Sequence, residues 1–197
     1  LYSYQSTNSG TDSGGTCEAN GAELNSIGTL INQAVEDGAQ IISVSQSDSD
    51  SSNEVKWAIA NAVSRGVIIV ASVGNNAKDE NSNHLSRWSG VVGVSAINSD
   101  GTFASYSSWG DGVVTAAVGG PYNTYDASTN EPTTVSGTSI STPLVAGMLA
   151  LARQKWPNAT TNQILQSLVR SGLNPNHEWN KYTGYGATDG GGLVIDD

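Results

Sequence analysis

Ser139 is the residue of this sequence best suited to act as a nucleophile. It lies in Val135–Gly147, where Ser, Thr and Gly precede an apolar run, and Pro143 fits the first turn of a helix, where a missing N–H costs nothing. Free N–H groups and the positive dipole end at such a helix start would favour an oxyanion beside the Ser139 hydroxyl. The plain alternative is a Ser/Thr cap that only begins the helix.

The helix that follows Ser139 is expected to lie in the protein core. It is apolar on most sides, and several small residues would let a neighbouring backbone come close. The apolar positions are Leu144, Val145, Met148, Leu149, Leu151 and Ala152, and the small ones are Ala146, Gly147 and Ala150. We predict a core helix over Ser139–Lys155 that ends before Trp156-Pro157.

The rest of the chain alternates between apolar runs and segments with helical spacing. We expect helices at Ala22–Asp37, Glu54–Arg65 and Thr161–Ser171. We expect strands at Gln40–Ser45, Val67–Ser72 and Val91–Ile97, and further short extended segments at Phe103–Ser107 and Val113–Val118. Leu1–Tyr4 alternates as a strand does. From Asn174 onward the chain is polar, aromatic and Gly-rich. The alternation predicts an α/β fold with a mostly parallel β-sheet and helices on both faces.

Composition narrows the class of protein. A chain of 197 residues fits one domain with a real core. Its net charge of −10 argues against nucleic acid or an anionic membrane as a partner. No apolar run approaches the ~18 residues of a membrane span, and no signal peptide stands in the chain as given. Cys17 is the sole cysteine, so an internal disulfide or a Cys-based metal site is not expected.

The segment Gly137–Gly147 closely resembles the nucleophile segment of subtilisin-like serine proteases, the subtilases. That family usually reads Gly-Thr-Ser-Met-(Ala/Ser)-Thr-Pro-His-Val-Ala-Gly, and this chain differs by Ile140 for Met and Leu144 for His. The segment is not the Gly-x-Ser-x-Gly elbow of α/β-hydrolases, because Ser141 stands where the second Gly would be. The resemblance implies a serine endopeptidase that hydrolyses peptide bonds through an acyl-enzyme on Ser139.

The resemblance extends along nearly the whole chain. The further matching segments are Leu1–Gly15, Ile41–Ser45, Val67–Asn75, Phe103–Gly110 and Tyr182–Gly186. They correspond to only the carboxyl-terminal two-thirds of the family domain. We therefore expect residues 1–197 to form one partial subtilase catalytic domain, subtilisin-like and incomplete at the amino-terminal side.

The resemblance also assigns residues around the nucleophile. Asn75 would be the side-chain donor of the oxyanion hole, together with the backbone N–H of Ser139. The substrate-binding residues would be Ser45, Gln46, Ser47, Ser72, Val73, Gly74, Ser13 and Gly14. On the residues alone, Gly74-Asn75-Asn76 is a common turn and the serine-rich stretches are solvated loops. Asp48 and Asp50 nearby suggest tolerance for basic residues in the substrate.

The catalytic base and its acidic partner are absent from the family's expected positions. His84 and His177 lie in polar loops, and neither stands in the Gly-Thr context of the family histidine. Asp12-Ser13-Gly14 mimics the family's Asp-(Ser/Thr)-Gly, but too little chain follows it before Ile41–Ser45 to hold the histidine helix. A serine without a base is a weak nucleophile. We therefore expect this chain to be inactive alone.

Cofactor chemistry is not required for this reaction, and we predict none. Calcium is common in the family, and the available acidic residues are Asp48, Asp50, Asp79, Glu80 and Asp189. Their spacing matches no defined calcium loop, so we predict no metal site while calcium stays open. The five Trp residues fall in different elements, which favours core or loop packing over a carbohydrate-binding surface.

Three functions stay open at this point. The first is the serine-bearing part of a subtilisin-like endopeptidase that acts on proteins or peptides outside the cell or at its surface. The second is a non-catalytic binding or scaffold domain, a pseudoprotease that has kept the fold. The third is a two-chain assembly in which another polypeptide supplies Asp and His. An incomplete domain should expose a sheet edge and apolar surface, so we expect pairing with the missing amino-terminal segment or self-association.

Overall fold

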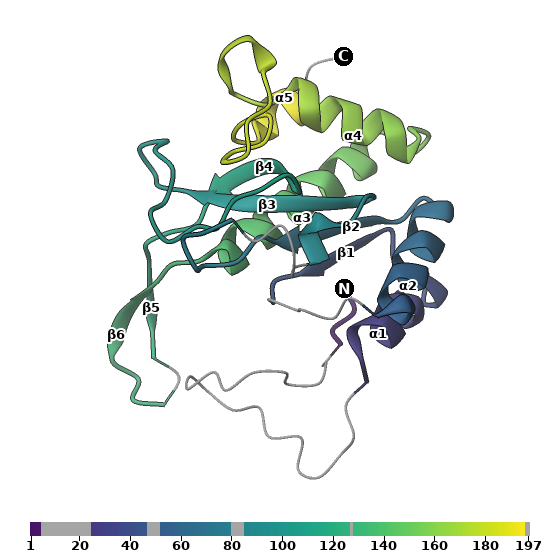
Figure 1. Ribbon diagram of the computed structural model, residues 1–197, viewed down its shortest axis with the longest axis horizontal. Helices are drawn as coiled ribbons and strands as arrows, with labels where there is room; N and C mark the ends of the chain where they lie inside the picture. The colour runs from purple at the N-terminus through teal and green to yellow at the C-terminus, as the bar shows by residue number, and fades with distance from the viewer. Residues whose placement is uncertain (5–24, 47–51, 80–84, 127, 196–197) are drawn as a thin grey trace.

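The fold is built on one parallel sheet. A computed structural model of the chain describes residues 1–4, 25–46, 52–79, 85–126 and 128–195. The strands are β1 (Ile41–Val44), β2 (Ile68–Ser72), β3 (Val91–Ile97) and β4 (Val113–Val118). They lie in the order β1-β2-β3-β4, and all three pairings are parallel (Figure 1). In a parallel sheet covered on both faces, nearly continuous apolar strands such as β2 and β3 are expected.

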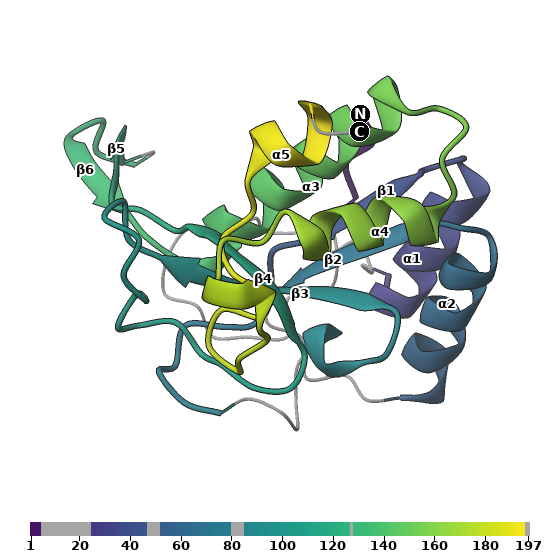
Figure 2. The same cartoon turned by 90° about the horizontal axis from the view of Figure 1, so that it is seen from above.

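Helices cover both faces of this sheet. Figure 2 shows α1 (Ile27–Glu36) and α2 (Asn53–Ser64) on one side, and α3 (Thr138–Lys155), α4 (Thr161–Arg170) and α5 (Gly190–Ile195) on the other. Each face of the sheet has its own hydrophobic core, and alternate residues of β2 point into one or the other. Ile69 and Ala71 pack with α1 and α2, whereas Ile68 and Val70 pack with α3 and α4. The predicted α/β class, with helices on both faces, is confirmed.

Polar side chains set where the helices begin. Ser26 accepts a hydrogen bond from the Thr29 amide at the start of α1, and Ser52 does the same for Val55 at the start of α2. Glu54 accepts from the hydroxyls of Ser26 and Thr29, which joins the two helix starts. At α4, Thr160 and Gln163 form a reciprocal capping box.

The structure corrects several expectations about the helices. The first helix begins at Ile27 rather than Ala22, because Ser26 caps it, and α3 begins at Thr138 after Gly137, with no side-chain cap. Pro143 therefore lies inside α3 rather than in its first turn. The expected all-round burial of α3 is wrong: Leu144 is 42% exposed and Leu151 is 55% exposed.

Five elements of the described part of the chain were not expected from the sequence. Strands β5 (Tyr122–Tyr125) and β6 (Pro132–Val135) form an antiparallel hairpin that projects from the body in Figure 1. The polar tail contains the short helix α5 and the 3₁₀ turn η2 (Pro175–His177); a second 3₁₀ turn, η1, covers Leu85–Arg87. The expected extended segment Phe103–Ser107 contributes one isolated bridge, between Phe103 and Ile97, and is otherwise turns.

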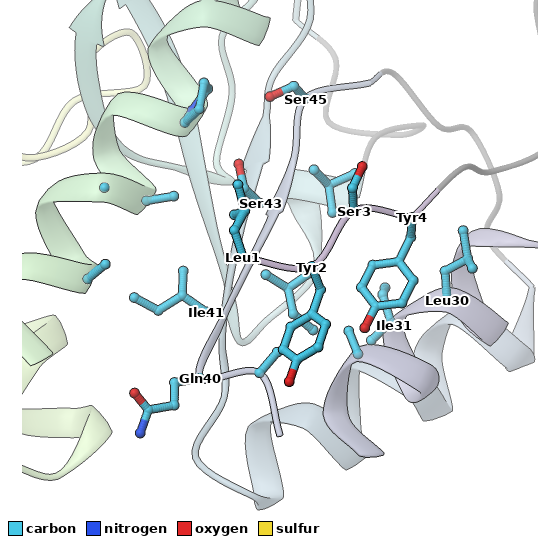
Figure 3. Close-up of a pocket in the computed structure, with 18 of the residues that line it drawn as sticks. Leu1, Tyr2, Ser3, Tyr4, Leu30, Ile31, Gln40, Ile41, Ser43 and Ser45 are labelled. Atoms are coloured by element: carbon cyan, nitrogen blue, oxygen red, sulfur yellow. The ribbon is translucent and has the colours of Figure 1, made fainter. Parts of the chain in front are cut away.

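A large groove runs along the outer edge of β1 (Figure 3). Within the described residues β1 pairs with β2 alone, so its other edge is open. The groove has a volume of about 1200 Å³ and is walled by α1 and by the small-residue face of α3, including Ala146 and Ala150. Residues 1–4 lie beside it, and the ring of Tyr4 points toward Leu30 and Ile31 of α1. The expected open edge and apolar surface are thus found together.

Burial along α3 gives the first prediction. Leu149 is fully buried against the sheet, and we expect Leu149→Ala to lower the free energy of unfolding by about 2–5 kcal/mol because it leaves a cavity. The matched control is Leu151→Ala on the exposed face of the same helix, which should change it by about 0.5 kcal/mol or less. Urea unfolding followed by circular dichroism measures both. Equal losses would contradict the assignment of the two faces.

Candidate active site

The carboxyl ends of β1 and β2 bring several of the expected residues to one edge of the sheet. Ser45 and Gln46 follow β1 and are exposed. Ser72 ends β2, and Val73 and Gly74 follow it; all three are buried. In open parallel sheets, ligands bind outside this carboxyl edge. Ser47, Ser13 and Gly14 lie outside the described residues, as do Asp12, Asp48, Asp50, Glu80 and His84.

Asn75 is held by the start of α3. Its Oδ1 accepts hydrogen bonds from the Thr138 amide at 2.8 Å and from the Thr138 hydroxyl at 3.0 Å. The Thr138 hydroxyl in turn accepts from the Gly74 amide at 3.2 Å. Because Oδ1 is occupied as an acceptor, the amide nitrogen Nδ2 faces away from Thr138 as a free donor.

Ser139 and Asn75 flank a space kept open by Gly137. A side-chain carbon built on Gly137 would lie 3.0 Å from Ser139 Oγ and 3.1 Å from Asn75 Nδ2. The hydroxyl and the amide nitrogen are therefore no more than about 6 Å apart. In the described residues the backbone N–H of Ser139 has no acceptor. The Ser139 hydroxyl and the Asn75 amide nitrogen thus lie close together, with Ser139 half-buried and Asn75 exposed to solvent.

The turn that carries Ser139 is anchored to β4 by side chains. The Ser141 hydroxyl donates to the Ala117 carbonyl at 2.9 Å, and both groups are buried. The Gly137 amide donates to the Gly119 carbonyl at 2.8 Å, and the Tyr106 hydroxyl donates to the same oxygen at 3.0 Å. Burial raises the pKa of Tyr106, so its hydroxyl keeps its proton and its donor role. These contacts fix the turn independently of the helix backbone.

The β5–β6 hairpin leads directly into this turn. Its far end is closed by Asp126, whose carboxylate accepts from the Ser128 hydroxyl and from the amides of Ser128 and Thr129. The Ser128 hydroxyl, followed by these amides, lowers the pKa of Asp126 to about 2. Tyr125 is 66% exposed on the hairpin, beyond the reach of the core.

The described residues give Ser139 no proton acceptor. His177 is exposed, and its Nδ1 lies 3.2 Å from the Gly172 carbonyl, with no hydrogen bond to Ser139. The part of the chain that the structure covers contains no group of three His, Cys, Asp or Glu residues placed to hold a metal ion. Nor does any described helix have both the length and the apolar character to cross a membrane.

Sequence reasoning assigned no separate role to Thr138, Gly137 and Tyr106. Gly137 and Thr138 stand inside the segment that resembles the subtilase nucleophile segment. That resemblance could have indicated that both residues belong to the site. Tyr106 stands in the similar Phe103–Gly110 segment, but its contact with Gly119 joins residues from separate loops. Only the folded chain shows these links.

A half-buried serine at a helix start beside free amide donors is an arrangement suited to acyl transfer. The model of the Subtilase family matches residues 10–186, and this chain belongs to that family. A thermostable alkaline protease of Halalkalibacterium halodurans is 32% identical over 87% of this chain and 45% of its own length. Subtilisin DY of Bacillus licheniformis is 30% identical over 73% of this chain and 53% of its own. The chain thus spans about half the length of these relatives.

Solved structures agree on the fold. The serine protease MycP1 of a type VII secretion system matches with a TM-score of 0.75 at 21% identity, over 86% of this chain and 56% of that one. The prenylagaramide maturation protease PagA matches with a TM-score of 0.72 at 23% identity, over 88% of this chain and 68% of that one. The predicted subtilisin-like fold is confirmed by these neighbours.

The Thr138 contacts give a second prediction. Thr138→Val removes the hydroxyl that bonds Asn75 and leaves the buried Gly74 amide without an acceptor, so we expect a loss of about 1–3 kcal/mol in unfolding free energy. Thr142→Val is the matched control, because that buried hydroxyl donates only to a helix carbonyl. Chemical denaturation compares the two. A Thr138→Val loss no greater than the Thr142→Val loss would show that the link between β2 and α3 contributes little.

Proposed function

We propose that the protein containing this chain is a serine endopeptidase of the subtilisin type. The observation that carries the proposal is that Ser139 Oγ and Asn75 Nδ2 lie 3.0 Å and 3.1 Å from the point where a side-chain carbon of Gly137 would stand. A peptide carbonyl placed there would meet the nucleophile at its carbon and N–H donors at its oxygen. Membership of the subtilase family, whose relatives named above are proteases, supports the same reaction.

In the proposed reaction a base takes the Ser139 proton while Oγ bonds to the carbonyl carbon. The carbonyl electron pair moves to oxygen, where Asn75 Nδ2 and the Ser139 N–H stabilise the negative charge. The pair then returns, the C–N bond breaks, and the base gives its proton to the leaving amine. Water repeats the sequence on the resulting acyl-enzyme. The reaction needs no cofactor.

We propose that the substrate is an extended stretch of protein or peptide lying along the carboxyl edge of the sheet. Ser45 and Gln46 after β1, and Ser72–Gly74 at the end of β2, would wall the residue before the scissile bond. The support is their position on adjacent parallel strands next to Asn75. Ser47, Ser13 and Gly14 keep their proposed substrate roles from the family resemblance alone.

We propose that the histidine and aspartate of the triad come from outside residues 1–197, and that the segment carrying them packs in the groove along β1. The open strand edge, the exposed face of α3 and the groove volume of about 1200 Å³ support this placement. Without that segment, a second copy of the chain would cover the same apolar surface. Alone, the chain would be inactive.

We also propose that the protein acts outside the cell or at its surface. A relative from Xanthomonas campestris, named an extracellular protease, is 33% identical over 68% of this chain and 24% of its own length. The composition, rich in Gly, Ser, Asn and Thr, is compatible with export.

The third prediction concerns the base that Ser139 needs, and labelling with a fluorophosphonate tests it. Chain 1–197 should react slower than the longer protein by about 10³-fold or more, because the described residues offer Ser139 no proton acceptor. Ser139→Ala in the longer protein should abolish labelling, which identifies the reacting residue. Labelling of chain 1–197 at the rate of the longer protein would overturn the proposal that the base comes from outside residues 1–197. A longer protein that folds but never labels would favour a pseudoprotease.

The oxyanion role of Asn75 gives a fourth prediction. In the longer protein, Asn75→Ala should lower kcat by about 10²–10³-fold with little change in KM, the loss known for the side-chain donor of a subtilisin oxyanion hole. Asn76→Ala makes the same change one residue further along and should leave kcat within about twofold, in line with a residue outside the transition state. Equal kcat values for the two variants would remove Asn75 from the site.

A further inference from the structure

A second concavity lies at the amino-terminal ends of β1 and β2. It has a volume of about 400 Å³ and is lined by residues from five segments: Val35 of α1, Gly38–Gln40 before β1, Arg65–Val67 before β2, Arg153 of α3, and Thr160-Thr161 at the start of α4. Arg153 lies 14 residues after Ser139 on the same helix, which places it about 20 Å away at 1.5 Å per residue. The concavity is therefore separate from the candidate active site.

This pocket carries two guanidinium groups and no carboxylate. The guanidinium of Arg153 donates to the Gly66 carbonyl at 2.8 Å, the Thr161 hydroxyl at 2.6 Å and the Ala159 carbonyl at 3.3 Å, all uncharged acceptors. Its buried Nε has no partner at all among the described residues. Arg65 is exposed and its side chain has no partner in the described part of the chain.

Two acidic residues, Glu36 and Asp37, lie between the lining residues Val35 and Gly38. Asp37 precedes the pocket residue Gly38, and its carboxylate accepts from the Tyr4 hydroxyl and from Gln33 Nε2. In a protein with a net charge of −10 and only 8 Lys and Arg residues, two unneutralised arginines in one pocket are an unusual use of positive charge. Guanidinium groups bind carboxylates in a planar, bidentate geometry, and such bonds are about twice as strong as neutral ones.

The backbone at the start of α4 offers a further donor for a carboxylate. The capping box satisfies the amides of Thr160 and Gln163, whereas the Thr161 amide at the start of α4 has no acceptor in the described residues. The carbonyls that end α1 and α2 are already paired, because Gly38 and Gly66 donate to Val35 and Val63. The carboxyl ends of these helices carry negative partial charge, so the positive charge of the pocket lining comes from Arg65 and Arg153.

We propose that this pocket binds a carboxylate group, held between Arg65 and Arg153 near the start of α4. The carboxylate has two possible sources, a small dissolved anion or an Asp or Glu side chain of a polypeptide in the β1 groove. The second source is open because Gly38–Gln40 and Arg153 line both the pocket and that groove. In either case the site is an anion site remote from the nucleophile, and it does not depend on the protease proposal.

The test is an NMR titration of ¹⁵N-labelled chain 1–197 with sodium acetate, with sodium chloride at matched ionic strength as the reference. The Thr161 amide and Arg153 Nε should shift saturably with millimolar acetate and not with chloride. Arg65→Ala should weaken acetate binding by about tenfold or more, the loss of one charge-assisted contact. Arg170→Ala, which removes the same charge from the last turn of α4, should bind as the unchanged chain does.

The longer protein separates the two sources. If a dissolved anion is the ligand, the longer protein binds acetate as the short chain does. If an acidic side chain fills the pocket, the longer protein does not bind acetate and Arg65→Ala lowers its melting temperature more than Arg170→Ala does. The proposal is overturned if the short chain shows no saturable shift, or if its Arg65→Ala variant binds acetate as tightly as the unchanged chain.

Discussion

The hydrogen bonds between Asn75 and Thr138 join the end of β2 to the start of α3, and the arrangement of the candidate site depends on them. These two residues are 63 positions apart in the chain, so no local structure could hold them together. One side-chain oxygen receives both donors of Thr138, and this leaves the nitrogen of the same amide group as a donor in the neighbourhood of the Ser139 hydroxyl. The orientation of the proposed oxyanion donor thus follows from which residue begins the helix.

The layers of the fold could be predicted from the sequence because the apolar residues of each strand indicate which of its faces are buried. β2 is apolar at nearly every position and is buried on both faces, as parallel sheets require. The hairpin escaped prediction because Tyr122–Tyr125 and Pro132–Val135 are short, polar and mostly exposed, with no apolar alternation. The exposed face of α3 escaped it for the opposite reason: Leu144 and Leu151 are as apolar as core residues, and only the packing shows that nothing covers them.

Some residues of the candidate site could be predicted from the sequence and others could not. Ser139 and Asn75 could be singled out because their neighbours in the sequence resemble those of a known family, and the fold brings both to one edge of the sheet. The contacts of Thr138 and Tyr106 with residues from other loops could not be read from spacing, since each depends on how separate segments pack. The charged pocket at the opposite end of α3 had no local pattern either, because its two arginines are 88 residues apart in the chain.

Pro143 has a consequence for how the protein can vary. Because proline has no N–H, the carbonyl of Ser139, four residues earlier, receives no helical hydrogen bond from it. The turn around Ser139 is instead tied down by Asn75, by the bond from Ser141 to Ala117 and by the bond from Thr142 to Thr138. The position of the serine therefore depends on the polar side chains of Asn75, Ser141 and Thr142 as well as on the helix backbone, so substitutions there, in evolution or in protein engineering, would displace it more readily than substitutions further along α3.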